Sequence, residues 1–167
     1  YLETLTDPSY YGQIVVQTFP LIGNYGVIPS DFESSQPHLK GYIVREWCHD
    51  PSNFRCEGDL DAFLKASNIV GMYGIDTRRL TKIIRESGVM NARITAKLPE
   101  DLSPVLKELA AYRITDAVGR VSCKETKEYS VEDAARRVVL WDFGAKENIA
   151  RELQKRGCHV VRMPAAA

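Results

Sequence analysis

The sequence predicts an α/β protein, and its last part predicts the first step of a doubly wound parallel sheet. Residues 138–162 read as an apolar strand, a turn at residues 142–144, a helix that Gly157 ends, and a second strand. Such a strand–helix–strand unit forms a right-handed crossover between parallel strands. Short apolar segments also alternate with helical patterns upstream, and 44% hydrophobic with 26% charged residues is a composition typical of globular proteins.

The first predicted strands lie before residue 50. Residues 13–19 alternate in polarity as a strand does, and Pro20 ends the run. Residues 22–26 follow with two glycines, which permit a turn with positive φ. Residues 30–40 are polar and irregular, and residues 41–47 predict the next strand.

The middle of the chain predicts helices and strands in alternation. A helix is expected over residues 60–66 and a buried strand over residues 68–75, whose glycines indicate close approach of another backbone. A second helix is expected next, then a short strand over residues 90–95. A third helix is expected to run from residue 103 to about residue 112.

The ends of these helices carry recognisable signals. Asp59 stands near the start of the first helix, Asp76 or Thr77 caps the second, and Gly88 stops it. Ser103 caps the third helix, and the proline after it suits a first turn. The second helix has an apolar stripe at i, i+3, i+4 spacing, formed by Leu80, Ile83 and Ile84.

Residues 119–137 change in character because they are charged, with only scattered apolar positions. They predict a linker or a hairpin between two parts of the protein. In the helix after this segment, Ile149 and Leu153 are expected to face inward. Tyr1 opens directly on a structured segment and PAAA closes the chain after a strand, so both ends are interpreted as cuts in a longer protein.

Charge and cysteine content exclude several classes of function. Lysine plus arginine equals aspartate plus glutamate at 22 each, so the net charge indicates neither a nucleic-acid partner nor an anionic membrane. No apolar run approaches the roughly 18 residues that span a bilayer, and the start has no secretory signal pattern. No C-x-x-C pair occurs among the cysteines, which predicts reduced thiols, a cytoplasmic protein and no metal site; they are Cys48, Cys56, Cys123 and Cys158.

Two short motifs could suggest catalysis or phosphate binding, and both are better explained otherwise. The sequence Gly144-Ala145-Lys146 follows a strand, but the phosphate-loop and dinucleotide-binding patterns are absent, so a tight turn is the preferred interpretation. Cys48 and His49 are adjacent, and neighbours on a strand point to opposite faces, which argues against a thiol–imidazole pair. The residues therefore favour a structural interpretation of both motifs.

Two other features keep both a structural and a functional interpretation. Ser9 lies in the turn-rich stretch TDPSYYGQ, where it can simply bond its own backbone, or present a pre-positioned hydroxyl and N–H to a small polar ligand. Arg78, Lys82 and Arg85 form a basic stripe on the second helix. That stripe is either a solvated face, with Lys82 paired to Glu86, or a surface for an acidic protein partner.

Six blocks, taken in order, resemble a known family. They are TDPSYYGQIV, IGNYG, ESSQPHLKGYIVRE, SNFR, NIVGMYGIDTRRLTKIIRESG and WDFGAKENIARELQKRGC. The family is the small, glutamine-hydrolysing subunit of bacterial carbamoyl-phosphate synthase, and the resemblance covers nearly the whole chain apart from residues 96–137. Leu2 stands where the family usually has glutamine, which puts any role of that glutamine in doubt.

The resemblance implies a subunit of two parts. Residues 1–120 would form a swivelling β/β/α domain without its first strands, residues 121–137 a linker, and residues 138–167 the start of a class I glutamine amidotransferase domain. The family is a cytoplasmic ligase that works as a heterodimer in arginine and pyrimidine synthesis. Its small subunit releases ammonia from L-glutamine, and its large subunit joins that ammonia to bicarbonate with ATP and magnesium. No cofactor is expected in this chain.

The resemblance also defines which functional residues are expected here. The family uses a Cys–His–Glu triad whose cysteine lies in a G-x-C-x-G turn, and none of the four cysteines has that setting, so this chain alone is expected to be inactive. The serine of TDPSY contacts the bound glutamine in the family, and here it is Ser9. Two alternatives stay open: a docking or regulatory module for the large subunit without chemistry, and a relative whose nucleophile has been replaced.

Overall fold

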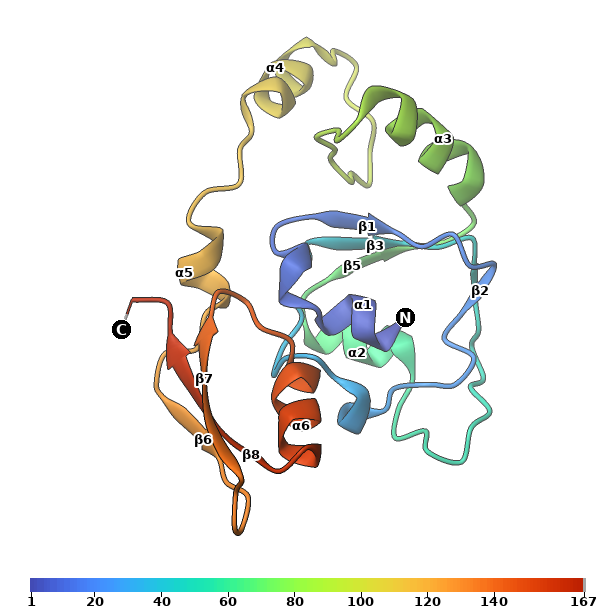
Figure 1. Cartoon of the computed structure of the whole chain (residues 1–167). Helices are drawn as coiled ribbons and strands as arrows, with labels where there is room; N and C mark the ends of the chain where they lie inside the picture. Colours follow the sequence, from blue (N-terminus) through green and yellow to red (C-terminus); the bar gives the residue numbers. More distant parts are fainter. Residues whose placement is uncertain (167) are drawn as a thin grey trace. The chain divides into compact units, whose positions relative to one another are not determined.

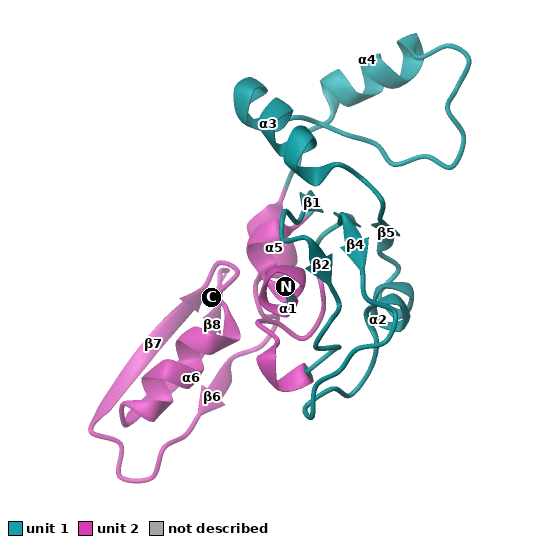
Figure 2. Cartoon of the chain, turned by 90° about the vertical axis from the view of Figure 1, so that its right-hand side faces the viewer, with its two compact units in different colours: residues 1, 12–28, 39–115 teal, residues 2–11, 29–38, 116–167 magenta. Residues whose placement is uncertain are grey.

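The computed structural model describes residues 1–166, which divide into two compact units (Figures 1 and 2). Unit 1 contains residues 1, 12–28 and 39–115, and unit 2 contains residues 2–11, 29–38 and 116–167, of which residue 167 lies outside the description. The units therefore interleave along the chain. The domain boundaries expected from the resemblance, 1–120, 121–137 and 138–167, stay a prediction.

Unit 1 is built on two small parallel sheets. The three-stranded sheet has the order β1-β3-β5, and a two-stranded sheet pairs β2 with β4. Helix α2 contacts β5, and Figure 1 shows it along one face of the larger sheet. The elements are β1 (Ile14–Val16), β2 (Leu21–Ile22), β3 (Gly41–Ile43), β4 (Glu46–Trp47), α2 (Leu60–Ala66), β5 (Val70–Met72), α3 (Thr77–Ser87) and α4 (Ser103–Ala111).

Unit 2 is a three-stranded sheet with a helix on one face. The strand order is β6-β8-β7, in which β7 is parallel to β8 and β6 is antiparallel to it. Helix α6 packs on this sheet, as both figures show. The elements are α1 (Leu2–Thr6), a 3-10 helix (Pro8–Tyr10), a second 3-10 helix (Pro29–Asp31), α5 (Ala117–Val121), β6 (Lys127–Tyr129), β7 (Arg136–Asp142), α6 (Glu147–Lys155) and β8 (Cys158–Pro164).

Each unit has an apolar core of its own. The sheet of unit 1 and α2 share buried side chains that include Tyr42, Ile43, Leu60 and Leu64. The core of unit 2 consists of Tyr129, Ala150, Cys158 and Val160, with Val138, Leu140 and Leu153 packed against it. The apolar alternation of β7 and β8 thus turns one set of side chains toward α6, as expected for paired strands.

The α/β class, the parallel β7–α6–β8 unit and several helix ends are confirmed. Helix α2 has the predicted bounds, and the Asp59 carboxylate accepts the N–H of Ala62 at 2.9 Å. Asp76 caps α3 by accepting the N–H of Arg79 at 3.0 Å, and Gly88 ends that helix with φ 77°. A glycine allows this backbone angle at no steric cost.

Other predicted elements are shorter than expected. The strand expected at 13–19 is reduced to β1, and the strand expected at 41–47 is divided because β3 pairs with β1 and β5 whereas β4 pairs with β2. Strand β5 is also short, and its burial was predicted wrongly, since Val70 is 52% exposed. The segment predicted as a linker or hairpin contains the end of α5, all of β6 and the start of β7, and α1 has no counterpart among the predicted elements.

Three detailed predictions are wrong. No strand forms at residues 90–95, because the side-chain amide of Asn91 donates to the carbonyls of Leu109 and Tyr112 at the end of α4 instead of joining a sheet. Ile149 is 44% exposed, since Ala150 and Leu153 form the inward stripe of α6. Helix α4 has Leu102 at its N-cap without a side-chain hydrogen bond, so Ser103 does not cap it.

Candidate functional site

The bend that carries Ser9, residues 7–11, is a rigid turn of unit 2. Asp7 is almost completely buried, and its Oδ1 accepts the backbone N–H of Ser9 at 2.9 Å. The N–H of Tyr10 donates to the Asp7 carbonyl and that of Tyr11 to the Pro8 carbonyl, which closes the short 3-10 helix. Ser9 is an exposed residue, and its side chain hydrogen-bonds the Asp7 carboxylate.

Lys146 holds the carboxylate of the Ser9 bend in place. Its Nζ lies 3.0 Å from Asp7 Oδ2 and 2.9 Å from Glu3 Oε1. Burial by itself would raise the pKa of the Asp7 carboxyl, but hydrogen bonds from Ser9 and Lys146 together with the Lys146 charge lower it below its ordinary value. Lys146 therefore connects the start of α6 to the bend, a role that its sequence context alone did not indicate.

The turn between β7 and α6, residues 142–146, is organised by Asp142. This fully buried carboxylate accepts the N–H groups of Gly144 and Ala145 on Oδ1, at 2.8 and 2.7 Å. Oδ2 accepts the N–H of Cys123 at 2.7 Å and Nε of Arg162 at 2.8 Å. Because an internal carboxylate already occupies these N–H groups, the tight-turn interpretation of residues 144–146 is supported over phosphate binding.

Gly144 allows this turn to lie close to the Ser9 bend. Its φ is 100°, in the region that favours glycine. A Cβ atom at this position would meet Val121 Cγ2 at 2.8 Å and Pro8 Cβ at 3.5 Å. The contact with Val121 of α5 would force a shift, whereas the contact with Pro8 of the bend is an ordinary van der Waals distance.

A third segment, the loop of residues 32–34, contacts α6 and Thr6, the residue directly before the bend. The carbonyl of Glu33 accepts the N–H of Glu147 at 2.8 Å, and Glu33 Oε2 accepts the N–H of Asn148 at 2.9 Å. The N–H of Glu33 donates to Thr6 Oγ1 at 2.9 Å, and the Ser34 hydroxyl donates to the Thr6 carbonyl at 2.6 Å. We take the Ser9 bend, this loop and the β7–α6 turn together as the candidate site.

One signal in the sequence could have revealed the loop contact. Helix α6 begins after Lys146, which makes no side-chain capping hydrogen bond. A helix start without Ser, Thr, Asp or Asn leaves N–H groups that need a partner from elsewhere in the fold. An acidic residue such as Glu33 suits that position because the helix dipole favours negative charge there.

The cysteines show no arrangement for nucleophilic catalysis or metal binding. The Cys48 thiol donates to the carbonyl of Asp50 at 3.4 Å, while the His49 ring packs on Trp47 with centroids 4.0 Å apart. The two side chains thus have different partners, in line with the argument against a dyad. Within residues 1–166 there is no group of three or more His, Cys, Asp or Glu residues that could hold a metal ion.

The predicted basic stripe lies on α3 and faces solvent. Arg78, Lys82 and Arg85 are all exposed, and no ion pair involves them among the described residues. The predicted pairing of Lys82 with Glu86 is therefore wrong. In residues 1–166 no helix combines the length and apolar character needed to cross a membrane.

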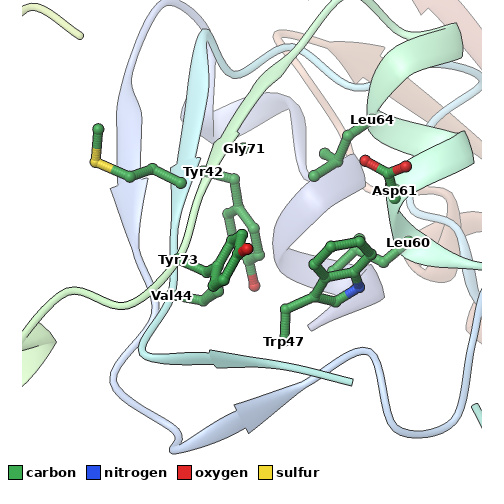
Figure 3. A pocket seen from close by; sticks show the side chains of 9 residues that line it. Tyr42, Val44, Trp47, Leu60, Asp61, Leu64, Gly71 and Tyr73 are labelled. Atoms are coloured by element: carbon green, nitrogen blue, oxygen red, sulfur yellow. The ribbon is translucent and has the colours of Figure 1, made fainter. Parts of the chain in front are cut away.

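Unit 1 has a hollow of about 100 Å³ that no sequence motif predicted (Figure 3). Its wall is mostly apolar and aromatic, and the one carboxylate, Asp61, is paired with Lys65. The side chains that line it come from β3, β4, β5, α2 and the residues beside them: Tyr42, Val44, Trp47, Leu60, Asp61, Leu64, Gly71, Met72 and Tyr73. None of these residues belongs to the candidate site, and the hollow is a gap between α2 and the sheet.

Comparison with known proteins agrees with the family indicated by the sequence blocks. Residues 1–94 match the family model described as carbamoyl-phosphate synthase small chain, CPSase domain. A carbamoyl phosphate synthase small chain of Clostridium perfringens is 48% identical over 164 residues, which are 98% of this chain and 46% of that protein. One of Bacillus cereus is 49% identical, over 98% of this chain and 44% of that protein.

A third relative adds a more specific name. The pyrimidine-specific small chain of Bacillus subtilis is 47% identical over 165 residues, which are 98% of this chain and 44% of that protein. The chain thus spans less than half the length of the curated relatives that it matches. The family model covers more than half of this chain, and the chain therefore belongs to the carbamoyl-phosphate synthase small-chain family.

Proposed function

We propose that this chain is part of the glutamine-hydrolysing small subunit of a carbamoyl-phosphate synthase. That subunit cleaves the side-chain amide of L-glutamine and supplies the ammonia to a large synthetase subunit. The large subunit, using ATP and magnesium, forms carbamoyl phosphate from ammonia and bicarbonate in the cytoplasm. Family membership and the retained TDPSY, ESSQP and WDFGAKEN segments support this proposal.

Within that activity, the chain contributes to substrate binding and not to bond cleavage. We assign Ser9 as a contact to glutamine, because it is an exposed residue on a bend that Asp7 and Lys146 hold rigid. A fixed hydroxyl can hydrogen-bond a polar ligand without the entropic cost of ordering a loop. The thiolate that attacks the amide, and its histidine and glutamate partners, would come from a part of the protein outside these 167 residues.

The experiment that tests this assignment is Ser9→Ala in the full-length subunit assembled with its large partner. Loss of one substrate hydrogen bond should raise KM for glutamine by about tenfold, whereas synthesis from added ammonia should be unchanged. Ser87→Ala removes an exposed hydroxyl on α3 and serves as the matched control. An unchanged KM for glutamine in the Ser9 variant would show that Ser9 does not contact the substrate.

The products would feed arginine and pyrimidine synthesis. The names of the Bacillus subtilis and Halalkalibacterium halodurans relatives contain "pyrimidine-specific", and this chain is 47% and 48% identical to them. Those names support the pyrimidine branch for this protein. A deletion strain that regains growth without uracil when the full-length gene is supplied would test it, and rescue of an arginine requirement alone would contradict it.

A second candidate function, docking to the large subunit, rests on the stripe of Arg78, Lys82 and Arg85. Three exposed cations on one helix, without ion pairs in the described part of the chain, suit an acidic surface on a partner. Changing all three to glutamate should weaken capture of the large subunit, and added salt should weaken capture of the unchanged protein too. Lys97→Glu with Lys107→Glu alters exposed cations elsewhere in unit 1 and should have little effect.

A further inference from the structure

Glu33 is a charged residue with almost no exposed surface. Its relative exposure is 5%, although it lies in a loop outside any strand or helix. A buried carboxylate is costly unless hydrogen bonds compensate the lost hydration. Its hydrogen bonds therefore indicate what the residue does.

The first set of these bonds caps α6. Glu33 Oε2 accepts the N–H of Asn148 at 2.9 Å, and the Glu33 carbonyl accepts the N–H of Glu147 at 2.8 Å. One turn further along, Nη2 of Arg151 donates to the carbonyl of Phe32 at 2.9 Å. The loop thereby supplies the capping group that Lys146, at the N-cap position, does not provide.

The second set reaches the residue immediately before the Ser9 bend. Thr6 is fully buried, and its hydroxyl oxygen accepts the N–H of Glu33 at 2.9 Å while donating to the carbonyl of Leu2 at 2.8 Å. The hydroxyl of Ser34 donates to the Thr6 carbonyl at 2.6 Å. Thr6 is thus held through both its side chain and its backbone.

We propose that Glu33 is a positioning residue for the glutamine pocket, which it serves by fixing the Ser9 bend relative to the start of α6 through Thr6. The inference rests on the proposed function, because it concerns the placement of the Ser9 hydroxyl. Two links join α6 to the bend: the ion pair of Lys146 with Asp7, and the hydrogen-bonded path from Asn148 through Glu33 to Thr6. In the second link, the Glu33 side chain is the group that accepts the N–H of Asn148.

This link matters because substrate contacts tolerate little displacement. A misplacement of about 1 Å at a reacting or binding group can cost as much as about 100-fold in rate. When Glu33 is truncated, the N–H of Asn148 loses its acceptor, and the loop that holds Thr6 keeps only the bonds of its backbone carbonyls to Glu147 and Arg151. The bend then keeps its own turn hydrogen bonds and the Lys146 ion pair, but the loop that positions Thr6 is held less firmly on α6.

The experiment compares Glu33→Ala, Glu33→Gln and Thr6→Val in the full-length subunit assembled with its large partner. Glu33→Ala and Thr6→Val should each raise KM for glutamine about tenfold, with kcat for glutamine hydrolysis within about twofold and ammonia-dependent synthesis unchanged. Glu33→Gln should restore most of the affinity, because its amide oxygen still accepts the N–H of Asn148. If Glu33 only stabilised the fold, its loss would lower the fraction of active enzyme. The apparent kcat would then fall while KM for glutamine stayed the same.

Glu152→Gln is the matched control, since it removes a carboxylate from α6 whose partners are the exposed cations Lys155 and Arg156. Its KM should equal that of the unchanged protein. If Glu33→Ala does not fold, the Thr6→Val and Glu33→Gln variants test the inference. An unchanged KM for glutamine in Thr6→Val would overturn it. A KM raised as much in Glu33→Gln as in Ser9→Ala would overturn it too.

The Ser9→Ala variant separates this inference from the proposed function. A raised KM for Ser9→Ala with an unchanged KM for Glu33→Ala leaves the glutamine contact in place and overturns only the positioning role. An unchanged KM for Ser9→Ala overturns the contact itself, whatever the Glu33 variants do.

Discussion

At the scale of single residues, Lys146 shows how a surface-type side chain becomes structural. Its ammonium group lies between Glu3 and Asp7, and hydrogen bonds to these two carboxylates raise its pKa above the ordinary value. The Asp7 side chain is only 8% exposed, so it depends on this cation more than a surface carboxylate would. Without Lys146, a buried carboxylate would keep only the hydrogen bonds of Ser9 and would lose its compensating cation.

Lys146→Met should therefore destabilise the protein by about 2 kcal/mol, because removing one partner of a buried pair leaves the other uncompensated. Lys155→Met removes a cation whose pairing with Glu152 is exposed, and it should cost less than about 0.5 kcal/mol. Urea unfolding of the two variants beside the unchanged protein measures both values. An equal decrease in the free energy of unfolding of the two variants would show that the contact of Lys146 with Asp7 stabilises the protein no more than an exposed ion pair does.

Acid should destabilise unit 2 through three carboxyl groups. Burial opposes ionisation of Asp7, Asp142 and Glu147, but hydrogen bonds and neighbouring cations outweigh it, so each has a pKa below its ordinary value. A carboxyl group whose pKa is lower in the folded than in the unfolded protein stabilises the fold at pH values above its unfolded pKa of about 4. This stabilisation is lost as the pH falls through the pKa of the folded protein. Urea midpoints should therefore decrease below about pH 4, and Glu147→Gln should make that decrease smaller.

At the scale of elements, the β7–α6–β8 unit depends on two glycines with different surroundings. Gly157 follows α6 with φ 74° and has open space around the position of a Cβ atom. Gly144 precedes α6 with φ 100°, and a Cβ there would lie 2.8 Å from Val121. Both positions require a backbone angle that favours glycine, but only one is also crowded.

Alanine at these two glycines should separate strain from crowding. Gly157→Ala should cost about 1 kcal/mol for the left-handed backbone alone. Gly144→Ala should cost about 3 kcal/mol, since the clash adds an overpacking penalty and disturbs the turn held by Asp142. Thermal unfolding measures both, and a Gly144 variant as stable as the Gly157 variant would mean that Val121 moves aside freely.

At the scale of the whole molecule, the described residues are stabilised unevenly. Both units have a core, but the segment between α3 and α4 in unit 1 has no regular structure, and Val89 and Leu98 are 98% and 70% exposed. Backbone that lacks buried contacts opens with little free energy. The stable parts of unit 1 are therefore the sheet and α2.

Limited proteolysis should cut first within residues 89–102, and amide hydrogens there should exchange fastest. Amides of β7 and β8 should exchange slowest, because these strands pair along seven residues and enclose the core of unit 2. Mass spectrometry of timed digests and of exchanged peptides measures both. Slow exchange in residues 89–102 would show that a protein partner or another part of the protein covers this segment.

The sequence by itself determined the α/β class, the family, the parallel β7–α6–β8 unit, and the caps at Asp59, Asp76 and Gly88. These features depend on local periodicity and on backbone preferences that act within a few residues. Local patterns also misled, as at residues 90–95, where apolar alternation exists but Asn91 bonds the end of α4 and no strand forms.

Only the tertiary structure decided what surrounds Ser9. The contacts of Thr6 with Glu33, of Glu33 with Asn148 and of Lys146 with Asp7 join positions up to 139 residues apart (146 − 7 = 139), and no local pattern marks such pairs. The physical reason is that a buried carboxylate takes its hydrogen-bond donors from whatever the fold brings near, independent of sequence distance. Packing against the sheet likewise decides which residues of α6 are buried. Ile149, which is apolar and at a plausible spacing, faces outward, while Ala150 fills the core.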